Sequence, residues 1–439
     1  MAMLSEQEAK KLVDKIISYS RADEMSIALS GNRTGNIRYA RNTVSTNGET
    51  DNLAFSVTSV YGKRSGTATG NEFDDAALER TVRRAEEIAK LAPENPEYLP
   101  ALGPQQYGKG MNYSESTANI DPVYRVDAAL ASIQECVANK TTAAGYLEDS
   151  TSFVAIGNSN GLFGYNRSTG GEFTVTARTA DERGSGYGVQ YFTDASKLDT
   201  KAVTSVAVKK AIASREPKEL KPEKITVILE PQAAYDLLSL MVNAMDARSA
   251  DEGRSFFGKR GSGNRVGDQL FSDKVTIISD PFNPENPTSP FAGDGRPRTQ
   301  VTWIEKGVLK ALPYSRYWAD QKKVEAVPPP AGAFIVHGTD QSLEDLIKGT
   351  EKGVLVTRLW YIRGVDPQTL LYTGLTRDGT FYIENGEVKH AIKNFRFNES
   401  PANMLVNLEA MGKPVRINNS LVPPMKIRNF NFTSLSDAV

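Results

Sequence analysis

Histidine and cysteine, which supply many zinc ligands and catalytic groups, are scarce in this chain, and this restricts its chemistry. The 439 residues include two histidines, His337 and His390, and one cysteine, Cys136. One cysteine can form neither an intrachain disulfide nor a multi-cysteine zinc site, and two distant histidines argue against a self-contained zinc hydrolase with several histidine ligands. We expect structural roles for both histidines and a core position for Cys136.

One serine lies in a pattern typical of a catalytic nucleophile. Ser159 is the central residue of Gly157-Asn158-Ser159-Asn160-Gly161, which matches Gly-x-Ser-x-Gly. A nucleophile elbow needs a strand before the serine and a helix after it. Here the segment 162–165 reads as another short strand, so the pattern predicts a hairpin turn.

Two glycine-rich segments resemble fragments of phosphate-binding loops. They are Gly261-Ser262-Gly263 and Gly184-Ser185-Gly186-Tyr187-Gly188. Neither follows a strand and opens a helix, which phosphate binding requires, so we interpret both as turns.

Three carboxylates in a proline-rich loop, Asp280, Glu285 and Asp294, could bind a hard cation. Their spacing matches no known ion-binding loop, so we interpret them as solvated side chains.

Net charge and hydropathy narrow the class of protein further. Lys and Arg total 52 and Asp and Glu total 53, a net charge of −1, which excludes a whole-protein attraction to nucleic acid or anionic lipid. The N-terminus lacks a signal-peptide pattern, and no apolar stretch approaches the ~20 residues of a membrane helix. We expect a soluble cytoplasmic protein that binds no nucleic acid and no membrane.

The elements that must position these residues divide the chain into two halves. In the first half, Ser5 and Glu8 form a capping box before a helix, and further helices follow Asp74 and Asp121. Strands are expected from about 26 to 67, with a turn at Asn47-Gly48. A meander is expected over 143–191, with turns at 158–161 and 168–171, and a helix over 200–214.

The second half reads as mostly β. A buried-type strand over 225–229 precedes a helix over 232–245, and a strong hairpin signal lies at Glu384-Asn385-Gly386. The only clear late helix begins at Ser342. The fold class is therefore α+β. We expect an N-terminal α+β domain with an antiparallel sheet and helices (1–220) and a C-terminal β-rich domain (221–439), joined at the polar, proline-bearing segment 216–222.

Four segments of the second half resemble the TldD/PmbA (TldE) family, once called modulators of DNA gyrase and classed with the U62 peptidases. They are residues 247–257 (ARSADEGRSFF), 304–309 (IEKGVL), 374–387 (GLTRDGTFYIENGE) and 393–400 (KNFRFNES). The N-terminal helix and the strands over 42–70 look like the first domain of that family, so the resemblance covers nearly the whole chain.

The resemblance implies a cytoplasmic peptidase system with two subunit types. The TldD type carries His-Glu-x-x-x-His on the helix after the first strand of the second domain, and a late cysteine completes its zinc site. The PmbA/TldE type lacks these ligands and pairs with the first. Together they resemble a chambered metalloprotease that acts on unfolded or small peptides.

This chain can be compared with that motif position by position. By ungapped placement, Ser239 and Ala244 stand where the two histidines would be, and Leu240 stands where the glutamate would be. Leu and Ala offer no lone pair to a metal, a lone serine hydroxyl is a poor zinc ligand, and 407–425 contains no cysteine. The resemblance therefore implies a PmbA/TldE-type subunit with no catalytic residue, metal or cofactor of its own, and zinc in a TldD-like partner.

Residues directly after this helix are candidates for peptide or partner binding. They are Arg248, Ser249, Asp251 and Arg254. The two arginines could pair with acids or with a peptide carboxylate, or could fix a loop through internal salt bridges. We also expect the β-rich half to present a strand edge to an extended peptide, whose main-chain hydrogen bonds ignore side-chain identity.

Three classes of function stay open at this point. The first is a non-catalytic subunit of a metallopeptidase complex. The second is a stand-alone homodimer that binds peptides or small ligands without hydrolysing them. The third is an independent hydrolase with a non-metal mechanism, or a regulator of DNA gyrase.

Overall fold

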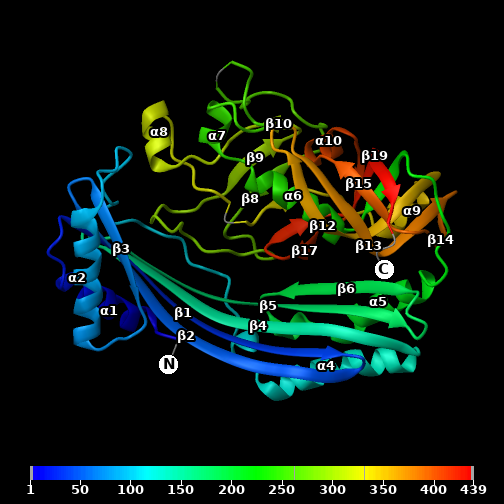
Figure 1. Ribbon diagram of the computed structural model, residues 1–439, viewed down its shortest axis with the longest axis horizontal. Helices are drawn as coiled ribbons and strands as arrows, with labels where there is room; N and C mark the ends of the chain where they lie inside the picture. Colours follow the sequence, from blue (N-terminus) through cyan, green and yellow to red (C-terminus); the bar gives the residue numbers. More distant parts are fainter. Residues whose placement is uncertain (1–2, 262, 331, 437–439) are drawn as a thin grey trace.

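The computed structural model describes residues 3–261, 263–330 and 332–436, and the strands of these residues form three sheets. Figure 1 shows the first half of the chain as a long sheet with helices on its outer side and at one end, and the second half packed above its other face. The fold is α+β, as predicted.

The first sheet is antiparallel and has the strand order β3-β2-β1-β4-β5-β6. Its strands are β1 (Glu24–Ala40), β2 (Thr43–Tyr61), β3 (Arg64–Gly70), β4 (Thr141–Asn158), β5 (Phe163–Thr179) and β6 (Ser185–Phe192). The helical segments of this half are α1 (Glu6–Ser18), α2 (Asp75–Leu91), α3 (Glu115–Ala118), α4 (Pro122–Ala138), the 3-10 helix η1 (Ala195–Lys197) and α5 (Thr200–Ala213).

Helices cover one face of this sheet because alternate strand residues are apolar. On β1, Ile27 and Leu29 pack with α1 and α2, whereas Ile37 and Tyr39 pack with α4 and α5. These are all odd-numbered positions of one strand, so both helix pairs lie on the same face. The buried Cys136 belongs to the α4 cluster, which confirms the predicted core role.

Local cap signals are confirmed by the structure. Ser5 and Glu8 form the reciprocal capping box at α1, and the carboxylates of Asp74 and Asp121 accept backbone N–H bonds at the starts of α2 and α4. Each cap satisfies amide donors that the first turn of a helix leaves unpaired.

Three predicted turns in the first half were wrong, and two of them lie inside long strands of the first sheet. Asn47-Gly48 lies inside β2, opposite Ile37 and Asn36, and the chain reverses instead at Arg41-Asn42, where both residues have φ near +55° (51° and 58°). The predicted turn over 168–171 lies inside β5. A turn-favouring residue pair is a local preference, and the long ladders between β1, β2, β4 and β5 override it.

The second half contains two further sheets. The larger has the order β12-β7-β19-β15-β13-β14, with β16 paired to β19, and β12 also pairs with β13, so five strands close on themselves. Its strands are β7 (Lys224–Leu229), β12 (Lys352–Asp366), β13 (Leu371–Glu384), β14 (Glu387–Ala391), β15 (Phe395–Glu399), β16 (Leu408–Met411) and β19 (Met425–Leu435). The predicted reversal at Glu384-Asn385-Gly386 is confirmed between β13 and β14.

The smaller sheet has the order β10-β9-β8-β11-β18-β17. Its strands are β8 (Ile277–Ser279), β9 (Val301–Glu305), β10 (Val308–Leu309), β11 (Ile335–Val336), β17 (Val415–Ile417) and β18 (Ser420–Val422). The helices of this half are α6 (Pro231–Asn243), α7 (Ala247–Asp251), α8 (Arg316–Lys322), α9 (Leu343–Lys348) and α10 (Pro401–Val406). The predicted late helix after Ser342 is confirmed as α9, which begins with a reciprocal capping box of Ser342 and Asp345. Helices α8 and α10 were missed, and neither has such a box.

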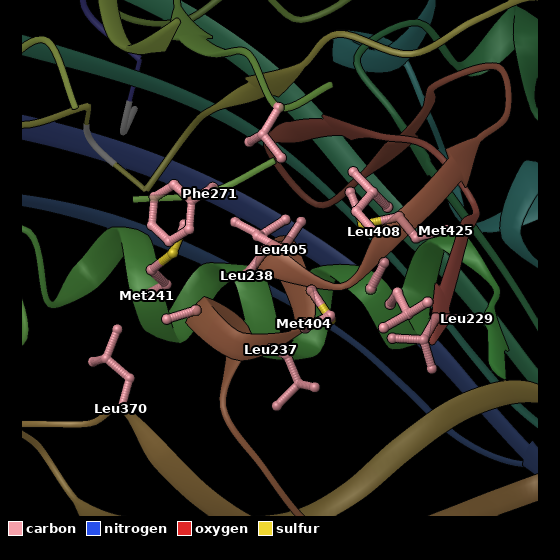
Figure 2. Packing of buried hydrophobic residues seen from close by; sticks show 14 of the residues in the cluster. Leu229, Leu237, Leu238, Met241, Phe271, Leu370, Met404, Leu405, Leu408 and Met425 are labelled. Carbon is pink, nitrogen blue, oxygen red and sulfur yellow. The ribbon is translucent and has the colours of Figure 1, made fainter. Parts of the chain in front are cut away.

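Helix α6 is at the centre of the second core. Figure 2 shows Leu237, Leu238 and Met241 of this helix among side chains from α10 and the barrel strands, including Met404 and Leu405. Burying an aliphatic side chain of this size contributes about 1.5–3 kcal/mol. In the described residues, no helix is both long and apolar enough to cross a membrane.

Candidate functional site at helix α6 and the neighbouring cleft

Helix α6 starts immediately after β7, so the barrel determines where the helix points. Glu230 is the N-cap residue and Pro231 occupies the first turn, where the missing amide hydrogen has no cost. One face of α6 is buried, including Ala234 and Leu238, which are 0% exposed. The opposite face carries Asp236 and Ser239 and is only partly buried.

The positions compared with the zinc motif hold no ligating group. The Ser239 hydroxyl lies 3.4 Å from the carbonyl oxygen of Asp236, one turn earlier in the same helix. Leu240 packs against the hydrophobic core, and Ala244 is the C-cap residue of α6. Among the described residues, no three His, Cys, Asp or Glu side chains come together in a way that could hold a metal ion. These side chains do not fit a zinc ion.

Asp236 is the one carboxylate of α6, and it was not among the predicted site residues. Its carboxylate accepts hydrogen bonds from Gln232 Nε2 (2.8 Å) and from the backbone N–H of Leu359 on β12 (3.1 Å). Burial raises the pKa of Asp236 to about 6, despite these bonds and the charge of nearby Arg358. The only carboxylate of a mainly apolar helix was the signal in the sequence that could have indicated this residue.

An ion pair joins the start of α6 to the first half of the chain. Lys210 Nζ on α5 lies 2.7 Å from Glu230 Oε2, and both side chains are about 15% exposed (15% and 14%). The Thr357 hydroxyl also donates to Glu230 Oε1, at 3.3 Å. Glu230 therefore links α5, α6 and β12.

A second set of contacts joins β6 to the barrel. Arg358 Nε donates to Asp378 Oδ2 at 2.6 Å, and the Ser185 hydroxyl of β6 donates to the other carboxylate oxygen. The Arg358 guanidinium lies 4.0 Å from the centre of the Tyr187 ring. Burial raises the pKa of Tyr187 to about 12, so this phenol stays protonated at neutral pH.

A cleft of about 800 Å³ lies between the two halves. It is lined by Tyr191 at the end of β6 and by Val415 and Arg416 of β17, together with loop residues that include Tyr113 and Glu285. The Arg416 side chain donates to the Thr193 hydroxyl, and burial lowers the pKa of Arg416.

Two sheet edges meet at this cleft. β6 is the last strand of the first sheet and β17 is the last strand of the smaller sheet, and each is paired on one side only among the described strands. Val415 is 44% exposed. Edge strands carry backbone N–H and C=O groups that can pair with an extended chain, so the cleft has the backbone chemistry for peptide binding.

The arginines predicted to bind a peptide or partner have internal ion pairs. Arg248 Nη2 lies 2.9 Å from Glu97 Oε1, Arg248 Nε lies 3.0 Å from Glu252 Oε1, and the guanidinium faces the Trp318 ring at 5.1 Å. Arg254 Nη2 lies 2.6 Å from the other oxygen of Glu252. Either arginine would have to exchange a carboxylate partner to bind a peptide.

Ser249 and Asp251 lie in α7, which Asp246 caps through the Ser249 N–H at 2.7 Å. Asp251 accepts hydrogen bonds from Asn264 Nδ2 (2.8 Å) and from Trp318 Nε1 (2.7 Å). Its carboxylate thus anchors the loop after α7 and helix α8. A role in peptide binding for these two residues and for Arg248 and Arg254 stays a prediction.

The other candidate residues lie apart from the cleft or have structural contacts. Ser159 is in the turn between β4 and β5, as predicted, and its hydroxyl oxygen accepts the Met25 N–H at 3.0 Å. His390 stacks on Tyr382 with 5.4 Å between ring centres. His337 is exposed at the end of β11, and its backbone N–H donates to Thr276.

Among the described residues, the three loop carboxylates do not come together as a cation site, and Glu285 lines the cleft. Asp280 accepts the backbone N–H of Phe282, and Asp294 pairs with Arg296 at 2.8 Å. Ser262 lies outside the described residues, so the prediction of a turn at Gly261-Ser262-Gly263 is described only at its two glycines, which have φ of 103° and 83°.

The segment 184–188 is not the predicted turn. Most of it belongs to β6, and its glycines allow close approach of α5. A Cβ atom at Gly186 would lie 2.1 Å from the carbonyl oxygen of Ala207.

Comparison with protein families gives the class of this chain. Three family models match in order: PmbA/TldA metallopeptidase domain 1 over residues 26–89, the central domain over 116–215, and the C-terminal domain over 222–434. The chain is thus built from metallopeptidase-type domains. It belongs to the PmbA/TldD family, as the resemblance implied.

Individual relatives agree over nearly the full length. Metalloprotease PmbA of Escherichia coli O157:H7 is 23% identical over 457 residues, covering 97% of this chain and 98% of the relative. The crystal structure of TldE from Thermococcus kodakarensis has a TM-score of 0.86 at 19% identity, covering 97% of this chain and 99% of the other. A Thermotoga maritima MSB8 protein, named for modulation of DNA gyrase, has a TM-score of 0.87 at 17% identity, covering 97% and 100%.

Proposed function

We propose that this chain is the metal-less, PmbA/TldE-type subunit of a cytoplasmic metallopeptidase, and that its partner is a TldD-like subunit that holds the zinc ion. In this proposal the chain forms part of the wall of a chamber in which unfolded or small peptides are cleaved. It supplies no catalytic residue.

The observation that carries this proposal is the state of helix α6. Ser239, Leu240 and Ala244 hold no metal ligand, yet the helix remains well packed in its core through Leu237 and Met241. A helix that lacks the zinc ligands but is still fully packed is expected in a subunit that contributes structure to the complex, while another subunit holds the zinc ion. The family membership, and a structural relative called TldE, support the same assignment.

The cleft supports a role in holding substrate. Two strand edges, β6 and β17, line a volume of about 800 Å³, which is within the usual size range of ligand sites. Main-chain pairing along such edges accepts many sequences, which suits a protease for unfolded chains. A wall of this kind would also keep water away from a zinc site in the partner.

Zinc content and casein hydrolysis test the proposal directly, for this chain alone, for its zinc-bearing relative alone, and for the mixture. We expect the chain alone to be metal-free and inert, and activity to appear or rise several-fold only in the mixture. Stoichiometric zinc or cleavage by the chain alone would contradict the placement of Ser239, Leu240 and Ala244.

The same experiment separates the alternative functions. A homodimer that binds peptide without changing the activity of the relative would favour a stand-alone peptide-binding protein. Hydrolysis by the chain alone that survives strong chelation would indicate a non-metal hydrolase. A change in gyrase supercoiling activity upon addition of the chain would favour a regulatory role.

A further inference from the structure

A second groove lies between the loop after α7 and helix α10, two elements on the outer side of the second half (Figure 1). Its volume is about 790 Å³. One wall carries Lys259, Arg260 and Arg265, and the other carries Gln368 and Asn403. None of the described residues that line the groove is acidic, whereas the chain as a whole is nearly neutral.

The positive charge of this groove is only partly neutralised. Asp268 is shared, because its carboxylate lies 3.2 Å from Lys259 Nζ and 3.7 Å from Arg265 Nε. Arg260 is exposed and forms no ion pair with any residue that the structure describes. Three cations against one carboxylate leave the groove with an excess charge of about +2.

The cationic wall is held in place before any ligand binds. Asn264 donates to the Asp251 carboxylate at 2.8 Å, and Lys259 N–H donates to the carbonyl of Gly263 at 2.9 Å. Arg265 N–H donates to the carbonyl of Phe257 at 2.8 Å. A preorganised loop loses less entropy when a ligand binds, so these bonds favour a specific site.

The opposite wall offers amide and apolar groups. Asn403 is fixed by a 2.8 Å bond to Glu399, and Val406 on the same helix is 51% exposed. Ser255 also lines the groove, and its hydroxyl oxygen is buried and has no hydrogen-bond partner in the described structure. A buried hydroxyl of this kind is energetically costly unless a ligand group bonds to it.

We propose that this groove binds an acidic segment of an extended peptide. Its cations match carboxylates, and its amides and the Ser255 hydroxyl match a peptide backbone. The Phe256 ring, which a nucleic acid base would need for stacking, is already packed against Phe271 and the Arg265 guanidinium. The proposal concerns a different surface from the cleft and does not depend on a zinc-bearing partner.

Fluorescence anisotropy with the full-length chain tests this proposal. The probe is a labelled octapeptide of alternating Glu and Ala, and the reference is the same peptide with Gln in place of Glu. We expect the acidic peptide to bind about tenfold more tightly at low salt, and the difference to disappear near 0.5 M salt, where charges are screened within about 4 Å.

Arg260→Ala is the informative variant, because this exposed side chain forms no ion pair within the described part of the chain. We expect it to weaken binding of the acidic peptide about fivefold, and Arg260→Glu to abolish the preference for that peptide. Arg84→Ala removes an exposed arginine from α2 and is the matched control, which should bind normally.

Equal affinity for the two peptides, or the same loss in Arg84→Ala as in Arg260→Ala, would overturn the proposal. Displacement of the peptide by a single-stranded oligonucleotide in an Arg260-dependent manner would overturn it in favour of a nucleic-acid site.

Discussion

At the scale of single residues, the side chains that pack α6 into its core are different from those at the positions compared with the zinc motif. Leu237, Leu238 and Met241 pack the helix into the hydrophobic core. Ser239 and Leu240, at positions compared with the zinc motif, offer no metal ligand. The helix could be predicted from its apolar residues, and the missing ligands could be read directly. The burial of Asp236 could not, because it depends on the backbone of β12, 123 residues further along the chain.

Asp236 gives a pH-dependent prediction. Its folded pKa of about 6 lies above the ordinary aspartate value near 3.9, so its protonated form stabilises the fold. That contribution is present below about pH 4, is lost as the pH rises to about 6, and is absent above it. We expect Asp236→Asn, which stays neutral, to be more stable than the wild type by about 1–2 kcal/mol at pH 8 and nearly equal to it at pH 4.5.

Thermal unfolding at the two pH values measures this difference. Asp127→Asn on α4 is the control, because Asp127 is exposed and its substitution should have no pH-dependent effect. A stability difference between Asp236→Asn and the wild type that is the same at pH 4.5 and pH 8 would show that Asp236 ionises normally in the folded protein.

At the scale of secondary-structure elements, local signals were predicted well and long-range ones poorly. The caps at Ser5, Asp74 and Asp121 act within four residues, so the sequence is sufficient to place them. The turn predicted at Asn47-Gly48 was wrong because the pairing of β2 with β1 outweighs the local turn preference. The role of Gly186 was missed because α5 approaches β6 only in the folded chain.

The contact of α5 with β6 predicts the effect of a single methyl group. A Cβ at position 186 would lie 2.1 Å from Ala207 O and 2.5 Å from Ala211 N, and neither backbone atom can move without shifting the helix. We expect Gly186→Ala to destabilise the protein by about 1–3 kcal/mol, the usual cost of overpacking. The midpoint of thermal unfolding, followed by circular dichroism, gives the measurement.

Gly293→Ala is the matched control for this substitution. A Cβ at Gly293 meets no atom within 4 Å, and its φ is not in the left-handed region. This variant should unfold at nearly the wild-type temperature. Equal destabilisation by both variants would mean that the loss comes from glycine replacement in general and not from the approach of α5.

At the scale of the whole molecule, the arrangement of the two halves creates the cleft. β6 and β17 are more than 200 residues apart in sequence, and each is the last strand of its own sheet. The strand patterns predicted a β-rich second half, and with it a possible edge for a peptide. They could not predict that two edges lie at one cleft, because this depends on contacts that hold the halves together.

The Lys210–Glu230 pair is the contact whose energetic role can be measured most directly. Both groups are largely buried and join α5 to the start of α6 at 2.7 Å. Removing one partner leaves a buried charge alone, so we expect Lys210→Met or Glu230→Gln to destabilise the protein by about 3 kcal/mol. The double variant leaves neither charge, so its loss of unfolding free energy should be smaller than the sum of the two single losses, with a coupling energy of about 1–3 kcal/mol.

The control cycle uses Lys10→Met and Asp14→Asn, which remove an exposed ion pair on α1. This pair should show a coupling energy below about 0.5 kcal/mol. Additive losses at Lys210 and Glu230 would mean that this ion pair does not hold the two halves together, and that other contacts between them, such as Ser185–Asp378 and Arg416–Thr193, do so instead.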